Sequence, residues 1–282
     1  MLAIPFIIFV FIFYYLPLRG WVMAFQDFRP HLGIAGSKWV GWLNFKLLFE
    51  DQRFYEVIRN TLAMNLLKLL FGFISAVGLA VILNEVRVYF FKRVVQTISY
   101  LPHFVSWVVA GNIIISMLSR GGPLNQFLLS IGILQEPILW LGQKSLFWLI
   151  IALTDVWKEV GWNAIIYLAA IASIDPVMYE AADIDGAGRI KKIFYITIPS
   201  IMPTIKIIFV MNIGWVLSMG FYQQYVLNNS LVAEVGEVLQ LYVIKYGINM
   251  FRFSYATAAG IFQTVVSLVL VFIVNKLIRA TD

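Results

Sequence analysis

Long apolar stretches alternate with short polar ones along the whole chain. A helix needs about 20 mostly apolar residues to cross the hydrocarbon core of a bilayer. Six stretches meet this length and predict six transmembrane helices, at residues 2–25, 61–83, 94–118, 146–172, 204–227 and 255–277. The pattern therefore predicts an all-α, polytopic membrane protein in which residues 1–282 form one transmembrane domain.

A polar insert at about 173–203 separates the fourth and fifth predicted spans. Asp175 before Pro176 is typical of a helix start, because the carboxylate caps free N–H groups and proline fits the first turn. Gly186 permits a positive φ and predicts a break. We expect two short helices at an angle, ending at Ile184 and near Tyr195, with Pro199 and Pro203 returning the chain to the fifth span.

Two interpretations of this insert compete. An amphipathic loop could rest on lipid headgroups, or a helical knob could fit a groove on another protein. Glu180, Asp183 and Asp185 fall within six residues, and these carboxylates disfavour contact with anionic lipid. The small side chains of Ala181, Ala182 and Ala187 allow close approach, which favours a protein dock.

The orientation follows from the Lys and Arg residues in the loops, which gather on the cytoplasmic side. Basic residues are dense after the second span, after the fourth span and in the tail, namely Arg87, Lys92, Arg93, Arg189, Lys191, Lys192, Lys276 and Arg279. We therefore expect both termini and the insert in the cytoplasm. The chain is apolar from Leu2 onwards without a basic n-region, so we interpret its start as a retained span, with a short cytoplasmic lead missing, rather than a signal peptide.

Composition narrows the chemistry. Hydrophobic residues make up 61% of the chain and charged residues 13%, which indicates lipid as the surrounding solvent. The absence of Cys excludes disulfides, thiolate metal sites and a catalytic thiol. The net charge of +6 is accounted for by cytoplasmic Lys and Arg, so no nucleic-acid partner is expected.

The chain shows no arrangement of residues for catalysis or metal binding. His31 and His103 stand alone in the sequence, so no metal site is predicted. There is no G-x-x-x-x-G-K-[ST] phosphate loop, so the chain has no such site for ATP. No Ser/His/Asp constellation supports hydrolysis, and we expect no enzyme activity and no cofactor.

The fourth span carries a polar stripe. With 100° per residue, one arc of about 140° holds five polar or amphipathic side chains, namely Asp155, Lys158, Glu159, Trp162 and Asn163. Ionisable groups within a span face a bundle interior or a water-filled cavity, so the stripe should point inward. Either it lines a substrate path, or Lys158 pairs with a neighbouring acid to hold helices together.

Other spans add polar candidates for the same path. Asn212, Trp215 and Tyr222 lie in the predicted fifth span, where Tyr222 could instead belong to an interfacial aromatic belt. Asn65 and Lys68 in the second span are interpreted as a helix contact or a snorkelling end. The loop between the first two spans is also aromatic, which fits either such a belt or a short helix that contacts an outer partner.

The insert resembles a known motif. Glu180-Ala181-Ala182, then Asp185-Gly186-Ala187, then Phe194, Ile198, Pro199 and Pro203 resemble the EAA loop of binding-protein-dependent ABC importer permeases. The segment 39–62 is similar to the outer segment before the second span of carbohydrate-type permeases. The segments 100–111, 121–128 and 253–271 are similar to the branch that imports polysaccharide fragments such as aldouronates and rhamnogalacturonan oligosaccharides. The resemblance implies that the insert couples to an ATPase through Glu180, Ala181, Ala182, Asp183, Asp185, Gly186 and Ala187.

The resemblance also implies an assembly in the bacterial cell membrane. A second permease subunit would complete an oligosaccharide path by alternating access, two cytoplasmic ATPase subunits would bind ATP and Mg, and an extracytoplasmic sugar-binding protein would deliver the cargo. The path residues would be Asp155, Glu159, Trp162, Asn163, Asn212, Trp215 and Tyr222. The alternatives are an ion-coupled secondary transporter, with Asp155 and Glu159 as carriers, or a membrane enzyme or scaffold with a docking loop.

Overall fold

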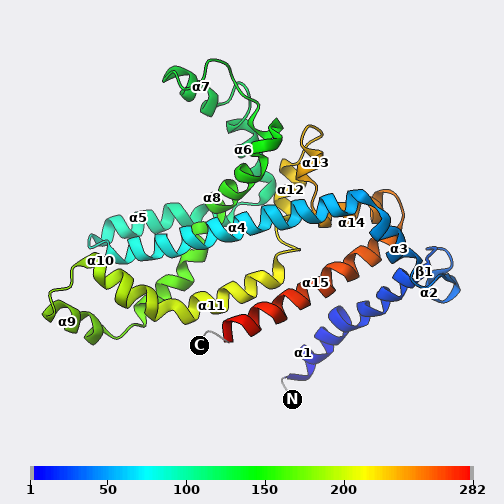
Figure 1. Cartoon of the computed structure of the whole chain (residues 1–282), viewed down its shortest axis with the longest axis horizontal. Coiled ribbons are helices and arrows are strands. Elements are labelled where there is room, and N and C mark those ends of the chain that lie inside the picture. Colours follow the sequence, from blue (N-terminus) through cyan, green and yellow to red (C-terminus); the bar gives the residue numbers. More distant parts are fainter. Residues whose placement is uncertain (1–2, 280–282) are drawn as a thin grey trace.

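Two long helices packed side by side form the centre of the protein. The computed structural model describes residues 3–279, and within it α4 (Gln52–Glu85) lies along α8 (Lys144–Ala172) (Figure 1). Ala76, Ala80 and Ala164 are buried where the two helices meet. Their small side chains allow the helix axes to approach closely, as is common between membrane helices.

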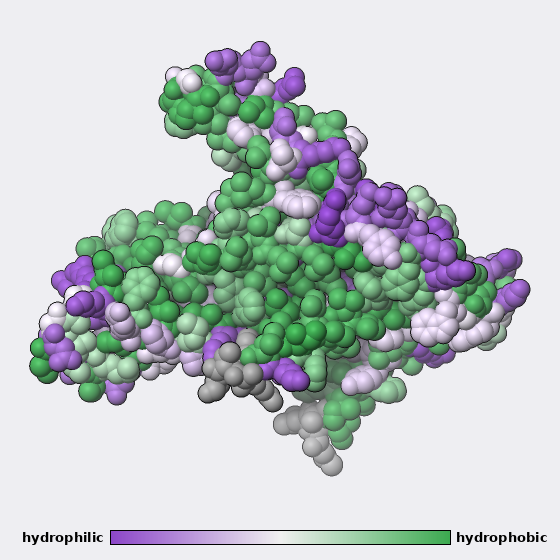
Figure 2. All heavy atoms as spheres, in the orientation of Figure 1, coloured by the Kyte–Doolittle hydropathy of each residue, from purple (hydrophilic) through white to green (hydrophobic). Residues whose placement is uncertain are grey.

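The surface is divided as expected for a membrane protein. Figure 2 shows hydrophilic residues at the end that carries α9 (Pro176–Ile184) and α10 (Arg189–Lys192), and again at the opposite end around β1 (Gln26–Asp27) and α3 (Leu43–Glu50). Hydrophobic residues cover most of the face that Figure 2 shows between these ends. The apolar band corresponds to the region that lipid would cover.

The all-α prediction is confirmed, but six straight spans are not. Among residues 3–279, four helices are long and apolar enough to cross a membrane: Ile4–Phe25, Gln52–Glu85, Arg189–Trp215 and Phe253–Leu277. The number rises to six if two bent helix pairs each count as one span. The predicted start at Leu2 lies outside the described residues.

The first span stands apart from the rest of the chain along much of its length. It comprises α1 (Ala3–Val10), a π-helical turn η1 (Phe11–Tyr15) and the 3-10 stretch η2 (Leu16–Phe25). No residue of η1 is buried, whereas η2 packs on α15 (Phe253–Arg279). Figure 1 shows α1 diverging from α15 towards the N-terminus.

A small polar cap follows this span. Strand β1 pairs antiparallel with β2 (Lys38–Trp39), with Gln26 opposite Trp39, and α2 (Gly33–Gly36) lies between them. Helix α3 comes next. The Asn44 side-chain amide donates to the backbone carbonyls of Ala24 and Gln26 at 2.9 and 3.1 Å, which fixes α3 to the end of the first span.

The third predicted span is broken. Helix α5 (Tyr89–Tyr100) and the turn η3 (Leu101–Phe104) meet α6 (Trp107–Met117) at 106°. Pro102 cannot donate the backbone hydrogen bond that a continuous helix needs. The Ser106 hydroxyl accepts from the Val109 N–H at 3.3 Å and starts the new helix. Helix α6 leads to α7 (Pro123–Ser130), and the two project from the body in Figure 1.

The fifth predicted span, 204–227, is wrong at both ends. One helix runs from α10 through the π-helical turn η5 (Ile193–Thr197) and α11 (Ile198–Trp215), with Pro203 inside it. The separate helix expected to end near Tyr195 is therefore the first part of this span. A turn with Gly220 at φ +81° then starts a separate helix, α12 (Phe221–Leu227).

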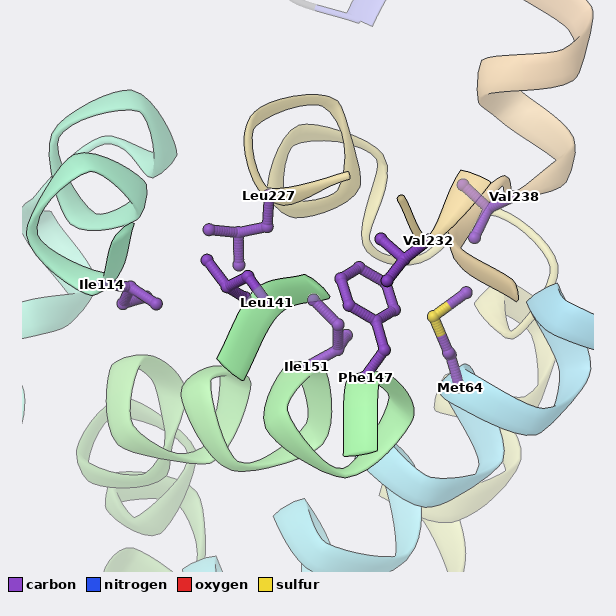
Figure 3. Close-up of a cluster of buried hydrophobic side chains, with 8 residues drawn as sticks. All are labelled: Met64, Ile114, Leu141, Phe147, Ile151, Leu227, Val232 and Val238. Atoms are coloured by element: carbon purple, nitrogen blue, oxygen red, sulfur yellow. The ribbon is translucent and has the colours of Figure 1, made fainter. Parts of the chain in front are cut away.

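Short helices complete the chain before α15, and the first two of them pack on one buried cluster. They are α13 (Ala233–Gly236), α14 (Leu239–Ile244) and the π-helical turn η6 (Lys245–Asn249). Figure 3 shows the cluster, which comprises Met64, Ile114, Leu141, Phe147, Ile151, Leu227, Val232 and Val238. Leu141 lies in the short turn η4 (Trp140–Gly142). The cluster joins α4, α6, α8 and α12 into one packed unit.

Candidate functional site

The insert that follows α8, residues 173–203, contains α9, α10, η5 and the start of α11, and is called the elbow below. Its first helix, α9, begins as the sequence predicted: Asp175 Oδ1 accepts from the Val177 N–H at 2.9 Å, and Pro176 occupies the first turn. Helix α9 meets α8 at 69°. The cap satisfies the free N–H of an exposed helix end, so the change of direction is specified locally.

Helix α9 ends in a Schellman motif. The Ala187 N–H donates to the Ala182 carbonyl at 2.8 Å, and the Gly186 N–H donates to the Asp183 carbonyl at 3.1 Å. Gly186 has φ +69°, a conformation that costs any residue with a Cβ about 1–2 kcal/mol. The predicted break at Gly186 is confirmed.

The elbow is held in place but presents its functional candidates to solvent. The Tyr179 hydroxyl lies 2.9 Å from Thr197 Oγ1, and Lys192 pairs with Asp183, so α9 is tied to the helix that follows. Glu180, Ala181, Asp183, Asp185 and Gly186 are exposed, and Ala182 and Ala187 are half-buried. Ile184 is 88% exposed, which gives this acidic surface an apolar centre.

A polar cleft of about 280 Å³ lies between α4, α8 and α11. Its lining includes Lys68, Asp155, Glu159, Asn163 and Asn212. The structure thus brings together four of the seven residues predicted for the path. Three of them, Asp155, Glu159 and Asn163, come from the stripe on α8, which points inward as its helical period predicted.

Lys68 is the cleft residue that sequence reasoning assigned to a helix contact or a snorkelling end. Its side chain is 5% exposed, and its Nζ lies 3.2 Å from Asp155 Oδ1, so it joins α4 to α8. The Asn65 amide donates to the carbonyls of Val216 and Met219 at 2.6 and 3.3 Å, beside Gly220. Its place in the middle of an apolar span could have indicated that Lys68 faces a polar cavity.

Glu159 is the centre of a second ionic group. Lys158 Nζ lies 3.1 Å from Glu159 Oε1, and His103 Nδ1 lies 2.6 Å from Glu159 Oε2. Lys158 also donates to the His103 carbonyl at 2.8 Å. These contacts anchor the turn η3, just before the break in the third span, to α8. The predicted pairing of Lys158 with a neighbouring acid is confirmed for Glu159, whereas Asp155 pairs with Lys68.

The remaining predicted path residues do not line this cleft. Trp162 stacks on the His103 ring with centroids 4.3 Å apart. Trp215 is 65% exposed, at the end of α11. Tyr222 lines a separate hollow of about 470 Å³ together with Ser218 and Gln240. Trp215 shares α11 with Asn212, whereas the turn between α11 and α12, which the sequence did not reveal, separates Tyr222 from both.

The fold and the elbow define a polytopic membrane transport subunit. A model of the family described as binding-protein-dependent transport system inner membrane component matches residues 68–281. The chain belongs to this family of ABC transporter permease subunits, which are non-catalytic components of their transporters. Family membership therefore favours ATP-driven transport over the ion-coupled, enzymatic and scaffold alternatives.

Relatives of the chain are similar over almost its full length. It is 40% identical over 280 residues to the polygalacturonan/rhamnogalacturonan transport system permease protein YteP of Bacillus subtilis, covering 99% of this chain and 87% of that one. It is also similar to a chain in the crystal structure of a bacterial ABC transporter involved in the import of the acidic polysaccharide alginate. That match has a TM-score of 0.91 and 38% identity, and it covers 99% of this chain and 94% of the other.

A further similar structure is the crystal structure of a bacterial alginate ABC transporter in complex with alginate pentasaccharide-bound periplasmic protein. The chain matches a subunit of that complex with a TM-score of 0.91 and 38% identity, covering 99% of this chain and 93% of the other. At this identity and coverage, the likeness extends beyond the fold to the family.

Proposed function

We propose that this chain is a permease subunit of an ATP-driven importer that carries oligosaccharides derived from acidic polysaccharides. The observation that supports this most strongly is the near full-length similarity to YteP and to the alginate transporter subunit. Polygalacturonan and alginate are both polymers of uronic acids, so the proposed cargo is a uronate-containing oligosaccharide.

The proposed assembly holds this chain, a second permease subunit, two cytoplasmic ATPase subunits and an extracytoplasmic sugar-binding protein. ATP and Mg bind the ATPase subunits in this proposal. The complex lies in the bacterial cell membrane with both termini of this chain in the cytoplasm.

In this proposal the elbow docks the ATPase. Its acidic face, with Glu180 and Asp183 around the exposed Ile184, presents a small rigid knob to a groove. The remaining coupling residues are Ala181, Ala182, Asp185, Gly186 and Ala187. Because α9 is capped at both ends and tied to the following helix, movement of the ATPase groove would be transmitted as a rigid-body rotation.

The cleft is the proposed substrate path. Asn163 and Asn212 supply amide donors and acceptors for sugar hydroxyls, and Asp155 and Glu159 supply acceptors. Trp162, Trp215 and Tyr222 remain candidates for stacking on sugar rings in another conformation of the transporter. Closure of the ATPase subunits would open the path outward, and their release would open it inward.

Uptake of labelled galacturonan, rhamnogalacturonan and alginate oligosaccharides tests the proposal. Cells lacking this chain should lose uptake of at least one of them, and an ATPase knockout should abolish the same activity while an uncoupler of the proton gradient leaves it intact. Uptake that survives the knockout but stops with the uncoupler would instead establish ion-coupled transport.

Glu180→Lys tests the elbow in the same assay. Charge reversal should reduce both co-purification with the ATPase and sugar uptake by at least tenfold. The reason is that a groove complementary to the acidic face of the elbow would then meet a cation in place of the Glu180 carboxylate. Glu50→Lys is the matched control, since Glu50 is exposed at the opposite end of the molecule. Unchanged assembly and uptake in Glu180→Lys would show that the elbow does not dock through this carboxylate.

A further inference from the structure

A second concave surface lies at the end of the molecule opposite the elbow. It is a hollow of about 410 Å³ lined by residues of the β1–β2 hairpin, α3 and the start of α15. Figure 1 shows these elements together at one end of the molecule. The walls of the hollow include Asp27, Lys38, Asn44, Phe251 and Arg252. We call these five residues and the hollow they line the outer-end patch. If the elbow is cytoplasmic, the patch faces the outside of the cell.

One aromatic side chain projects beside this hollow from a strained backbone. Phe251 has φ +55°, the only non-glycine residue with positive φ among residues 3–279, and it is 75% exposed. Hydrogen bonds from the Met250 N–H to the Lys245 carbonyl and from the Arg252 N–H to the Tyr246 carbonyl fix the turn on both sides. Strain of this kind persists only where the surroundings enforce it, and it concentrates at functional sites.

The support beneath Phe251 is rigid. The Arg252 guanidinium lies 4.3 Å from the centre of the Tyr255 ring and 5.5 Å from that of Tyr246. The Tyr255 hydroxyl in turn donates to Asp51 at 3.0 Å. An exposed ring on a preorganised support loses little conformational freedom on binding, which is the property of an interface anchor.

The charges around the hollow indicate the chemistry of a partner. Lys38 and Arg252 line it, and neither has a carboxylate partner within the part of the chain that the structure describes. Asp27, which also lines it, already pairs with Arg29 at 3.3 Å. The outer-end patch therefore presents two cations and one carboxylate, which Arg29 shares, beside an aromatic anchor. Its net positive charge complements an acidic, partly apolar protein segment.

A lipid headgroup is the competing occupant. Its phosphate would satisfy the two cations, and aromatic rings are common at headgroup level. However, an interfacial aromatic side chain needs no strained backbone to reach the headgroups, and lipid contact gives no reason for a single fixed ring beside a concave polar wall. The geometry therefore favours a protein.

We propose that the outer-end patch docks an acidic surface segment of the extracytoplasmic solute-binding protein, with Phe251 as the anchor residue. This inference rests on the proposed function, which supplies that partner. It assigns the contact to particular residues of this chain, and it can fail while the proposed function stands.

The test measures binding to the complete transporter in nanodiscs of neutral lipid. The probe is the solute-binding protein that stimulates the ATPase activity of the wild-type transporter. Phe251→Gly removes the ring while glycine tolerates the positive φ, so the turn is retained. The dissociation constant should rise at least tenfold, whereas the control Tyr55→Ala, which removes another exposed ring at this end, should leave it within about twofold.

Charge variants test whether the cations of the outer-end patch contribute to binding. Lys38→Gln should weaken binding at low salt and reduce its salt dependence, because one cation no longer faces the acidic segment. Lys46→Gln is the control, since Lys46 is exposed on α3 and already lies 3.9 Å from Glu50. Equal salt dependence in wild type and Lys38→Gln would overturn the charge argument.

A photo-crosslinker at position 251 identifies the occupant in cells. An adduct with the solute-binding protein supports the proposal, and an adduct with lipid or with the second permease subunit overturns it. If the wild-type transporter responds to a solute-binding protein but Phe251→Gly binds it normally, only the outer-end patch fails. If no solute-binding protein stimulates the wild-type transporter, the proposed function and the patch fail together.

Discussion

The elbow and the cleft are built in opposite ways. The elbow draws its caps, its turn and its small residues from one continuous segment, and the Schellman motif at Gly186 closes within six residues. The cleft is assembled from α4, α8, α11 and the turn at Gly220, and its Lys68–Asp155 ion pair joins two of these helices. The elbow should therefore tolerate damage elsewhere in the chain, whereas the cleft should depend on the packing of the whole bundle.

The largest effect is expected from Gly161→Val in the centre of α8. A Cβ at this position would lie 2.1 Å from the Ser99 carbonyl oxygen, so α5 cannot stay against α8. We expect the free energy of unfolding to fall by about 3 kcal/mol or more. Unfolding of the purified protein in detergent measures this. Gly72→Ala, where a Cβ meets no atom within 4 Å, is the control and should change little. Equal stability of both variants would contradict the packing argument.

Lys68→Met comes next. It leaves Asp155 without its counter-ion in a cleft where that carboxylate is only 24% exposed. We expect a loss of about 3 kcal/mol, at the low end for a broken buried ion pair because water still reaches Asp155. The same unfolding assay should show that Lys68→Met with Asp155→Leu recovers most of the stability. A double variant no more stable than the single one would mean that the two residues do not act as a pair.

Gly186→Val tests the elbow with a smaller global effect. Valine at φ +69° costs about 1–2 kcal/mol, and the strain is confined to an exposed turn. The unfolding transition should shift slightly, while co-purification with the ATPase falls at least tenfold if the elbow is the dock. Gly188→Ala is the control, because Gly188 has φ −70° and open space around it. A large shift in global unfolding would show that the elbow is not independent of the bundle.

The smallest effect is expected from Tyr179→Phe. It removes the hydroxyl that lies 2.9 Å from Thr197 Oγ1 and ties α9 to the following helix. We expect a loss of about 1 kcal/mol, as for a typical hydrogen bond. Hydrogen exchange should show faster opening of α9 with no change in the amides around the cleft. Equal acceleration at both places would remove the distinction between the two regions.

The elbow is built from neighbouring residues and the cleft from distant ones, and this difference decides how much of each could be predicted from the sequence. The start of α9 at Pro176 and the break at Gly186 were predictable, because both depend on neighbouring residues and local backbone preference. The inward direction of Asp155, Glu159 and Asn163 was predictable from the helical period.

The breaks in the spans were not predictable in this way. Apolar residues continue through both of them, and each is stabilised by distant partners: Asn65 at the carbonyls of Val216 and Met219, and Lys158 at His103. Tyr222 was therefore placed on one continuous helix with Asn212 and Trp215, whereas the Gly220 turn separates it from them.

The 106° break after η3 also has a consequence for biogenesis. The membrane insertion machinery meets residues 94–118 as one apolar stretch before α8 has been synthesised. The groups that hold the bent form, Lys158 and Glu159, arrive more than fifty residues after His103. We therefore expect the segment to enter the bilayer as a straight helix and to bend only when α8 docks. The bent arrangement would then form after this region has been translated, rather than during its translation.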